Sequence, residues 1–366
     1  LWENVAVYSS GVTLVMILQL IMFTKIIFYY IAARKPMFYS FLDFTICLLS
    51  FFYGILDYFL GTGGLTGISL GVNILIAIYA HNIYRDKNAS EVFWKSVFFT
   101  IMLSTIFAVI FGFTGDTALD RWVVGVGFVK QLYATVGTAR IGMFLCASLI
   151  YPVFYMNNRT LKIIFCTLLC LGVLMTFSIT SLICLVVFWL MIFLFKDTGN
   201  LRSSLKKIAL VSLVSTAVIL TWSSIQEVEL IKPLFIRAGS LIRGFESGDI
   251  SVATSSRSYL ARVYLDDYKS HSLFNKLFGS FYTSRFKALA SYSGVGNHSH
   301  NSFIDILLYS GVLGLLAYFV WMLVRISTLR GRKEFMPVIM LKVIFLLTGF
   351  SVSMFTSCYW FVWAIL

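Results

Sequence analysis

The sequence GNHSHNSFIDILLYSGVLG occupies residues 296–314 and joins a long polar segment to an apolar run. His298, His300 and Asn301 lie at the junction between the two. An apolar run of about 20 residues is long enough for a helix to cross the hydrocarbon core of a bilayer. The stretch therefore predicts a helix that enters a membrane directly after a cluster of polar side chains.

Similar apolar runs recur along the chain and decide its class. Of its 366 residues, 59% are hydrophobic and only 12% are charged, and the mean hydropathy is +0.88. We expect an all-α polytopic membrane protein with about 11 transmembrane helices and one large extracytoplasmic loop. The predicted spans are 5–31, 37–60, 64–82, 92–113, 136–156, 160–176, 180–195, 206–226, 302–324, 336–355 and 357–366.

The connections between these spans alternate in charge. Lys and Arg gather in every second connection, as is typical of loops on the cytoplasmic side. This topology explains much of the formal net charge of +13, and no nucleic-acid-binding motif accompanies that charge. It places Leu1 outside the cytoplasm, so we expect at least one helix upstream. The last span, 357–366, is short, so we also expect a continuation beyond Leu366.

The same topology divides the chain into three segments. Helices occupy 1–226 and 300–366, and an extracytoplasmic loop occupies 227–299. Apolar and aromatic residues recur every three to four positions within 255–268, so this part of the loop is predicted to be helical.

His300 is the candidate catalytic residue. Ser299 or Asn301 is expected to cap the helix that follows, which would place His300 at the positive end of a helix dipole. That field disfavours the imidazolium, so the neutral ring is available as a general base. The alternative is an ordinary interfacial histidine beside a capping asparagine. His298 has either an accessory or a solvent-facing role, and the similar pair His81-Asn82 is predicted to be structural because its position is cytoplasmic.

Three arginines are candidate anion ligands. Arg257 follows hydroxyl residues at a predicted helix start, where backbone N–H groups and a guanidinium can hold a phosphate. Arg262 lies over a turn further on, and Arg140 begins a span at its outer end, where a charge is costly unless it is paired or used. The alternative for Arg257 and Arg262 is a solvated loop charge. For Arg140 the alternative partner is a carboxylate such as Asp57 or Asp120.

Other features of the spans carry weaker predictions. Gly311 and Gly314 are expected to let a neighbouring helix approach closely. Lys25, Asp43 and Lys342 interrupt apolar runs, and Asp43 with Lys25 is interpreted as a structural pair or an ion route. The chain has no zinc-type ligand set, no acidic cluster for a hard cation and no nucleotide-binding glycine loop, so we expect neither metal nor cofactor.

Taken in order, these motifs resemble those of the O-antigen ligase and polymerase superfamily. The pair His300-Asn301 is followed after nine residues by Gly-Val-Leu-Gly, as in the signature of that family. Ser256-Arg257 with Leu273, Phe274 and Gly279 is similar to the segment that precedes the signature. Residues 140–144 and 176–180 are similar to two earlier elements, although Ile179 replaces an arginine common in ligases and Ser272 replaces a proline. The missing arginine favours the polymerase over the ligase.

The resemblance implies a glycosyltransferase at the outer face of the bacterial cytoplasmic membrane. Its substrates would be undecaprenyl-diphosphate-linked oligosaccharides, and membrane lipid and a chain-length co-polymerase would be partners. His300 and Asn301 would be catalytic, Arg257, Arg140 and Arg262 would hold the diphosphate, and Tyr259 would contact sugar. The alternatives are a ligase that transfers a lipid-linked glycan to another acceptor and a transporter of lipid-linked oligosaccharides that uses the intramembrane charges.

Overall fold

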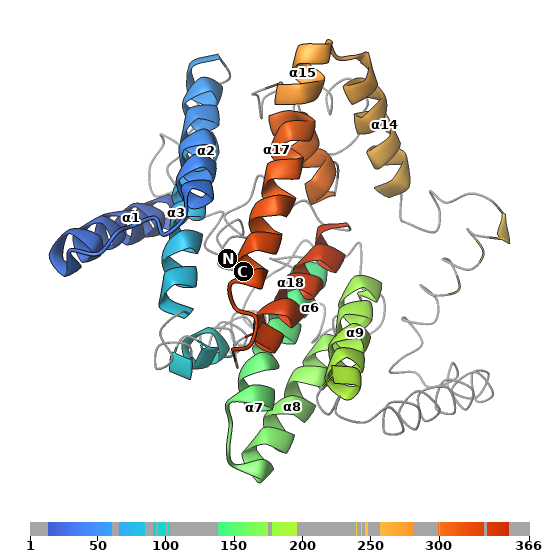
Figure 1. Ribbon diagram of the computed structural model, residues 1–366. Helices are drawn as coiled ribbons and strands as arrows, with labels where there is room; N and C mark the ends of the chain where they lie inside the picture. The colour runs from blue at the N-terminus through green and yellow to red at the C-terminus, as the bar shows by residue number, and fades with distance from the viewer. Residues whose placement is uncertain are drawn as a thin grey trace. The chain divides into compact units, whose positions relative to one another are not determined.

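The computed structural model describes residues 14–60, 66–84, 138–174, 178–195, 257–280, 299, 301–332 and 335–350, with short runs within 91–102 and 239–247. Every regular element in these residues is an α-helix (Figure 1). The chain divides into two compact units, the first formed by 1–92, 257–342 and 349–366, and the second by 93–256 and 343–348. The predicted spans 206–226 and 357–366, and most of 92–113, lie outside the described residues.

The first unit joins helices from both halves of the chain. Its members are α1 (Leu14–Ala33), α2 (Phe41–Leu60), α3 (Thr66–Tyr84), α14 (Arg257–Ser270), α15 (Leu273–Phe278) and α17 (Ser302–Ser327). The helices α2 and α3 pack along each other, and α17 packs against both α2 and α15. These bounds lie close to the predicted spans because each apolar run is continuous between polar connections.

The helix α17 is broken at Gly311, which has a φ of 69° and a ψ of −173°. We call residues 302–310 arm A and residues 312–327 arm B. The ring centroids of Phe303 and Phe319 lie 5.6 Å apart and the rings are stacked. In a straight helix these residues would be about 24 Å apart along the axis. Arm A therefore folds back toward arm B, and the predicted single span 302–324 is two helical segments.

The break is held open by a close backbone contact with the end of α15. A Cβ atom on Gly311 would collide with backbone atoms of Leu277 and Gly279, and one on Gly279 would collide with the backbone of Tyr309. Leu308 O, which a continuous helix would bond to the N–H four residues on, instead accepts bonds from Ser280 N at 2.9 Å and Ser280 Oγ at 3.0 Å. Gly311 thus lets the neighbouring helix α15 approach closely, as its spacing predicts, and it also forms the turn that breaks α17.

The second unit contains α6 (Thr138–Ser148), α7 (Ile150–Phe154), α8 (Arg159–Leu174) and α9 (Ile179–Phe195), while α18 (Phe335–Gly349) contributes residues to both units. Gly142 in α6 lies directly against the Ser181 side chain, where a Cβ atom would not fit. The thiol of Cys146 lies 3.7 Å from Ser181 O. Small residues therefore allow α6 and α9 to pack tightly.

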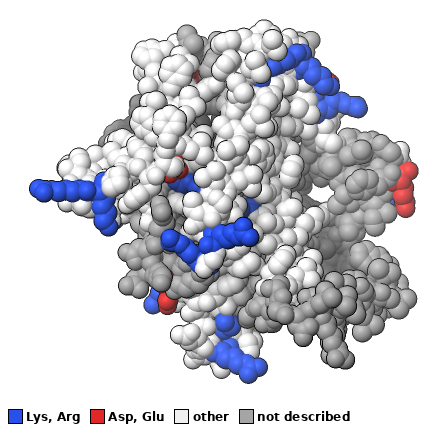
Figure 2. Space-filling view, viewed as in Figure 1, with Lys and Arg blue, Asp and Glu red and all other residues white. Residues whose placement is uncertain are grey.

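Apolar side chains make up much of the exterior of the described helices, whereas a few charged side chains, such as those of Asp43, Asp305 and Arg325, are buried. Arm B exposes a stripe of aliphatic side chains formed by Leu313, Leu316, Val320 and Leu323, and buries Tyr318, Trp321, Met322 and Arg325. Figure 2 shows that Lys and Arg occupy only a few places on the visible face. Two described helices, Phe41–Phe59 and Ser302–Ser327, are long and apolar enough to cross a membrane, and four shorter apolar helices accompany them. Because α17 is folded at Gly311, its length alone overstates the distance it can span.

Candidate functional site

The start of arm A is capped as the sequence predicts. Asn301 has extended backbone angles, and its side-chain oxygen accepts bonds from Phe303 N at 3.0 Å and Ile304 N at 3.2 Å. Two of the N–H groups that a helix leaves without partners are thereby satisfied. Since Oδ1 is committed to the cap, only the amide nitrogen of Asn301 remains to contact a substrate.

A hydrogen-bond network joins the two residues that flank His300 in the sequence, Ser299 and Asn301, to Asp305. Ser299 is fully buried, and its Oγ lies 2.6 Å from Asp305 Oδ1 and 2.8 Å from Asn301 O. The backbone N–H of Asn301 donates to the same hydroxyl at 3.0 Å. The residues before and after His300 are therefore both fixed to the first turn of arm A.

Asp305 changes the electrostatics expected at this helix start. It is only 1% exposed and lies in the first turn of arm A, where a negative charge interacts favourably with the helix dipole. Such an interaction contributes about 0.3–1 kcal/mol, and up to about 2 kcal/mol when it is partly buried. The sequence prediction for His300 considered only the positive end of the helix dipole. The carboxylate of Asp305 offsets that field.

The loop helix α14 packs directly on arm A. The ring of Tyr264 is buried against Ile304 and Leu308. Burial, followed by the charges of Asp305 and Asp267, raises the pKa of Tyr264 to about 12, so its phenol stays protonated near neutral pH. This packing holds α14 beside the network that surrounds Asp305.

The end of α14 is fixed to α15 and contains a buried histidine. Tyr268 Oη donates to Lys276 O at 2.8 Å. His271 is buried, and its Nε2 lies 3.2 Å from Asp267 Oδ2. The sequence prediction gave His271 no role, and the spacing of Asp267 four residues before it was the signal that could have revealed this pair.

The predicted ligands on α14 are brought only partly toward the site. Arg257 is the first residue of α14, although the placement of its side chain is not described. Tyr259 and Arg262 lie on the exposed side of α14, opposite Leu260 and Tyr264. The buried face of α14 thus packs on arm A. Tyr259 and Arg262 lie on the other face, where they are open to solvent or a ligand.

The structure does not show where the other predicted site residues lie relative to this network. His300 and His298 lie outside the described residues. Arg140 is in α6, in the second unit, and its side chain is likewise not described. Their roles stay predictions from the sequence.

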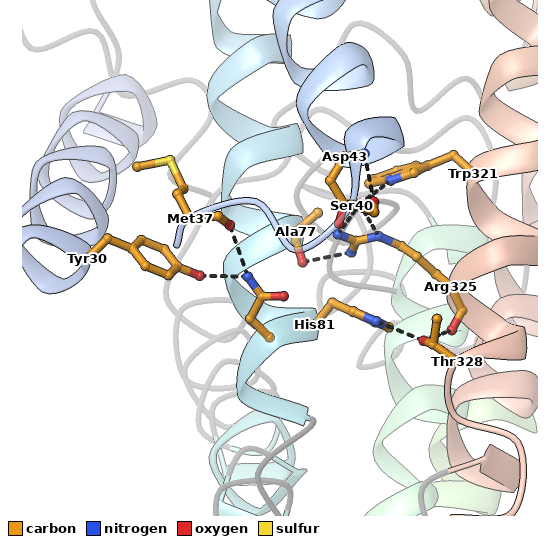
Figure 3. Close-up of polar contacts among 10 residues, drawn as sticks. Tyr30, Met37, Ser40, Asp43, Ala77, His81, Trp321, Arg325 and Thr328 are labelled. Carbon is orange, nitrogen blue, oxygen red and sulfur yellow. Dashed lines mark hydrogen bonds and ion pairs between the residues drawn. The ribbon is translucent and has the colours of Figure 1, made fainter. Parts of the chain in front are cut away.

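A second polar cluster surrounds Asp43 at the far end of arm B (Figure 3). Asp43 Oδ1 accepts bonds from Trp321 Nε1 at 2.8 Å and from Arg325 Nη2 at 2.9 Å. Arg325 also donates to Ala77 O at 3.1 Å and lies 4.4 Å from the centre of the Trp321 ring. The pairing of Asp43 with Lys25 that we predicted is wrong, because Lys25 is exposed on α1 and the carboxylate is bonded to Arg325.

His81 and Asn82 lie beside this cluster and make structural contacts. His81 Nε2 lies 3.2 Å from Thr328 Oγ1, which joins the end of α3 to the end of α17. Asn82 Nδ2 donates to Tyr30 Oη at 2.8 Å and to Met37 O at 3.2 Å (Figure 3). The structural role predicted for this His-Asn pair agrees with these contacts.

Neither a search for metal-binding clusters nor a comparison with known proteins adds to the description of the site. Within the part of the chain that the structure describes, no three His, Cys, Asp or Glu side chains gather in a way that could hold a metal ion. No protein-family model matches the chain, and a search of curated proteins gives no match.

Proposed function

We propose that this chain is a polytopic membrane glycosyltransferase that polymerises undecaprenyl-diphosphate-linked oligosaccharide repeat units. The reaction takes place at the outer face of the bacterial cytoplasmic membrane, with about 11 helices embedded in the bilayer. The observation that carries the proposal is the buried network of Ser299, Asn301 and Asp305, which fixes the chain on both sides of His300. A general base needs such positioning, because it acts only within hydrogen-bond reach of the proton it removes.

The arrangement of polar residues in the first unit supports the proposed topology. Charge alternation assigns Asp43, His81 and Arg325 independently to the cytoplasmic ends of three different spans. These residues lie in one cluster in the structure. Buried charges beneath an apolar exterior are typical of a membrane-embedded bundle, in which a charge is tolerated when it is paired inside.

The proposed reaction requires no external energy source. His300 accepts the proton of an acceptor-sugar hydroxyl, and the hydroxyl oxygen attacks the anomeric carbon of the donor. A new glycosidic bond forms while the bond between that carbon and the diphosphate oxygen breaks, and undecaprenyl diphosphate leaves with the electron pair. Arg257, Arg262 and Arg140 stabilise the negative charge on the leaving group, which is an electrostatic contribution to catalysis.

The residues around His300 have separate roles in this proposal. Asn301 shapes the helix start through its side-chain oxygen and can orient a sugar only through its amide nitrogen. Tyr259 is exposed on α14 and offers a ring for sugar contacts, and His298 is an accessory residue. Asp305 is a positioning residue that acts through Ser299 and does not touch substrate.

The ligase is the nearest alternative and differs only in the acceptor. A polymerase lengthens lipid-linked chains in a purified system that contains no second acceptor, whereas a ligase requires one. The transporter is less well supported, because Asp43 is bonded to Arg325 and Trp321 and Lys25 is exposed. These observations weaken the case for two of the three charges that the transporter alternative uses, whereas the third, Lys342, is buried.

The function is tested by comparing two histidines that share the same dipeptide. The purified chain, reconstituted in liposomes with a lipid-linked repeat unit, should extend the glycan. We expect His300→Ala to lower the rate of extension by a factor of about 10²–10⁴, the usual contribution of a general base. The matched control His81→Ala should retain extension per mole of folded protein, because His81 lies in the structural cluster.

Two outcomes would contradict the proposal. Normal rate and chain length in His300→Ala would exclude His300 as the base. Transfer of lipid-linked substrate across the bilayer without any glycosidic bond formation in the wild-type chain would favour a transporter.

A further inference from the structure

The short helix α15 presents an apolar surface that no described part of the protein covers. Leu273 is 73% exposed and Phe274 is 59% exposed, and Phe278 is exposed as well. The rings of Phe274 and Phe278 lie 5.0 Å apart, so the two side chains form one continuous patch. Removing such a patch from water is favourable in proportion to its apolar area.

The character of the exposed surface changes abruptly between α14 and α15. The exposed face of α14 carries Arg262, Asp266 and Lys269, with an ion pair of 2.8 Å between the last two. Only four residues after Lys269 the exposed side chains become Leu273 and Phe274. A charged face followed directly by an apolar face indicates that the exposed side of α14 contacts water and that the exposed side of α15 contacts an apolar environment.

One contact shows where α15 lies along the length of α2. Tyr53 Oη of α2 donates to Phe278 O at 2.8 Å. From Tyr53, α2 continues to Leu60, about 10 Å further along its axis, and still exposes Ile55 and Phe59 on the way. The neighbouring helix is therefore still apolar outside at the level where α15 lies.

We propose that the face of α15 formed by Leu273, Phe274 and Phe278 is inserted into the outer leaflet of the phospholipid bilayer. The apolar side chains meet the acyl chains, while Lys276 and Lys269 lie close enough along the chain to meet lipid phosphates. The segment 227–299 then contains an interfacial anchor. This inference rests on the proposed membrane topology but not on the proposed chemistry.

The inference is tested with the full chain in liposomes by a depth-sensitive probe. An environment-sensitive fluorescent amino acid is placed at Phe274 in one variant and at Asp266 in another. Asp266 is the matched control, because it is exposed on the charged face of the adjoining helix. Quenching is measured with lipids brominated on their acyl chains and, separately, with iodide in the aqueous phase.

We expect the probe at 274 to be quenched several-fold more strongly by brominated lipid than the probe at 266, with the reverse order for iodide. Equal behaviour of the two probes would overturn the inference. Protection of position 274 from both quenchers would also overturn it and would indicate that another protein surface covers α15. Because no turnover is measured, the two proposals can fail separately: lipid quenching at 274 together with normal glycan extension in His300→Ala would overturn the proposed chemistry and leave the anchor standing.

Discussion

Two buried carboxylates lie near opposite ends of α17 and are held in different ways. Asp43, 6% exposed, accepts bonds from Arg325 and Trp321, which belong to a helix far away in the sequence. Asp305, 1% exposed, is bonded to Ser299 only six residues before it. The first carboxylate joins separate helices, whereas the bond of the second to Ser299 lies within a short stretch of its own chain.

This difference distinguishes interactions that hold the helices together from an interaction that shapes the candidate site. Removing an interaction between helices should destabilise the fold, because a buried charge is left without its partner. Removing an interaction within one turn should leave the bundle intact and disturb only what that turn positions. The following variants test this distinction, from the largest expected effect to the smallest.

The largest effect is expected when the ion pair of Asp43 is broken. Asp43→Ala leaves the buried Arg325 guanidinium without its carboxylate and should lower the free energy of unfolding by about 3–5 kcal/mol. Chemical unfolding of the purified protein in detergent micelles measures this change. The control Lys25→Ala removes an exposed charge and should change stability by no more than about 0.5 kcal/mol. Equal unfolding midpoints for the two variants would show that the pair does not stabilise the bundle.

A smaller effect is expected at the turn between the two arms of α17. Gly311→Ala combines an unfavourable positive φ with a collision against the backbone of α15, whereas Gly331→Ala has a φ of 80° but open space around it. Overpacking typically costs about 1–3 kcal/mol, so Gly311→Ala should be less stable than Gly331→Ala by about that amount. The difference between the two unfolding free energies reports the collision together with the backbone strain at Gly311, whose ψ of −173° lies in a region that only glycine adopts readily. A difference near zero would mean that the arms can separate freely from α15.

The smallest effect on stability is expected at Asp305. Asp305→Asn keeps an oxygen that can accept the bond from Ser299 but loses the charge, so the free energy of unfolding should fall by only about 1 kcal/mol. Extension of the glycan should slow by roughly tenfold, equivalent to about 1.4 kcal/mol in the barrier. If Asp305 acts on the proposed base His300 through its charge, the acid limb of the pH–rate profile should move to lower pH in this variant. A loss of rate with an unchanged profile would assign Asp305 a purely structural role.

The positions of the helices could be predicted from the sequence because continuous apolar runs and caps are local signals. The cap at Asn301 and the loop helix that begins at Arg257 were both predicted from a few neighbouring residues. All-helical architecture among the described residues is confirmed in the same way. The number of spans and the roles of His300 and the arginines stay predictions.

The rest depended on contacts between distant residues, which no local pattern reveals. Gly311 sits in an apolar run where a glycine is equally compatible with tight packing, and the break appears only when Gly279 approaches it. Asp43 had Lys25 as the nearest cation in sequence order among the spans, but folding brings Arg325 to it. Ser299 was considered only as a cap, and its bond to Asp305 was not predicted, because a serine and an aspartate near a helix start usually face solvent.

The two serines that fasten the loop to arm A also determine where this protein can vary. Ser280 is bonded to Leu308 and Ser299 to Asp305, and these two partners are separated by about 4.5 Å along the helix. The segment 281–298 therefore starts and finishes at neighbouring points of one helix. Closing a longer segment between such points costs only about 0.6 kcal/mol per doubling of its length. Insertions or whole-loop exchanges within this segment should therefore be tolerated without disturbing the helices.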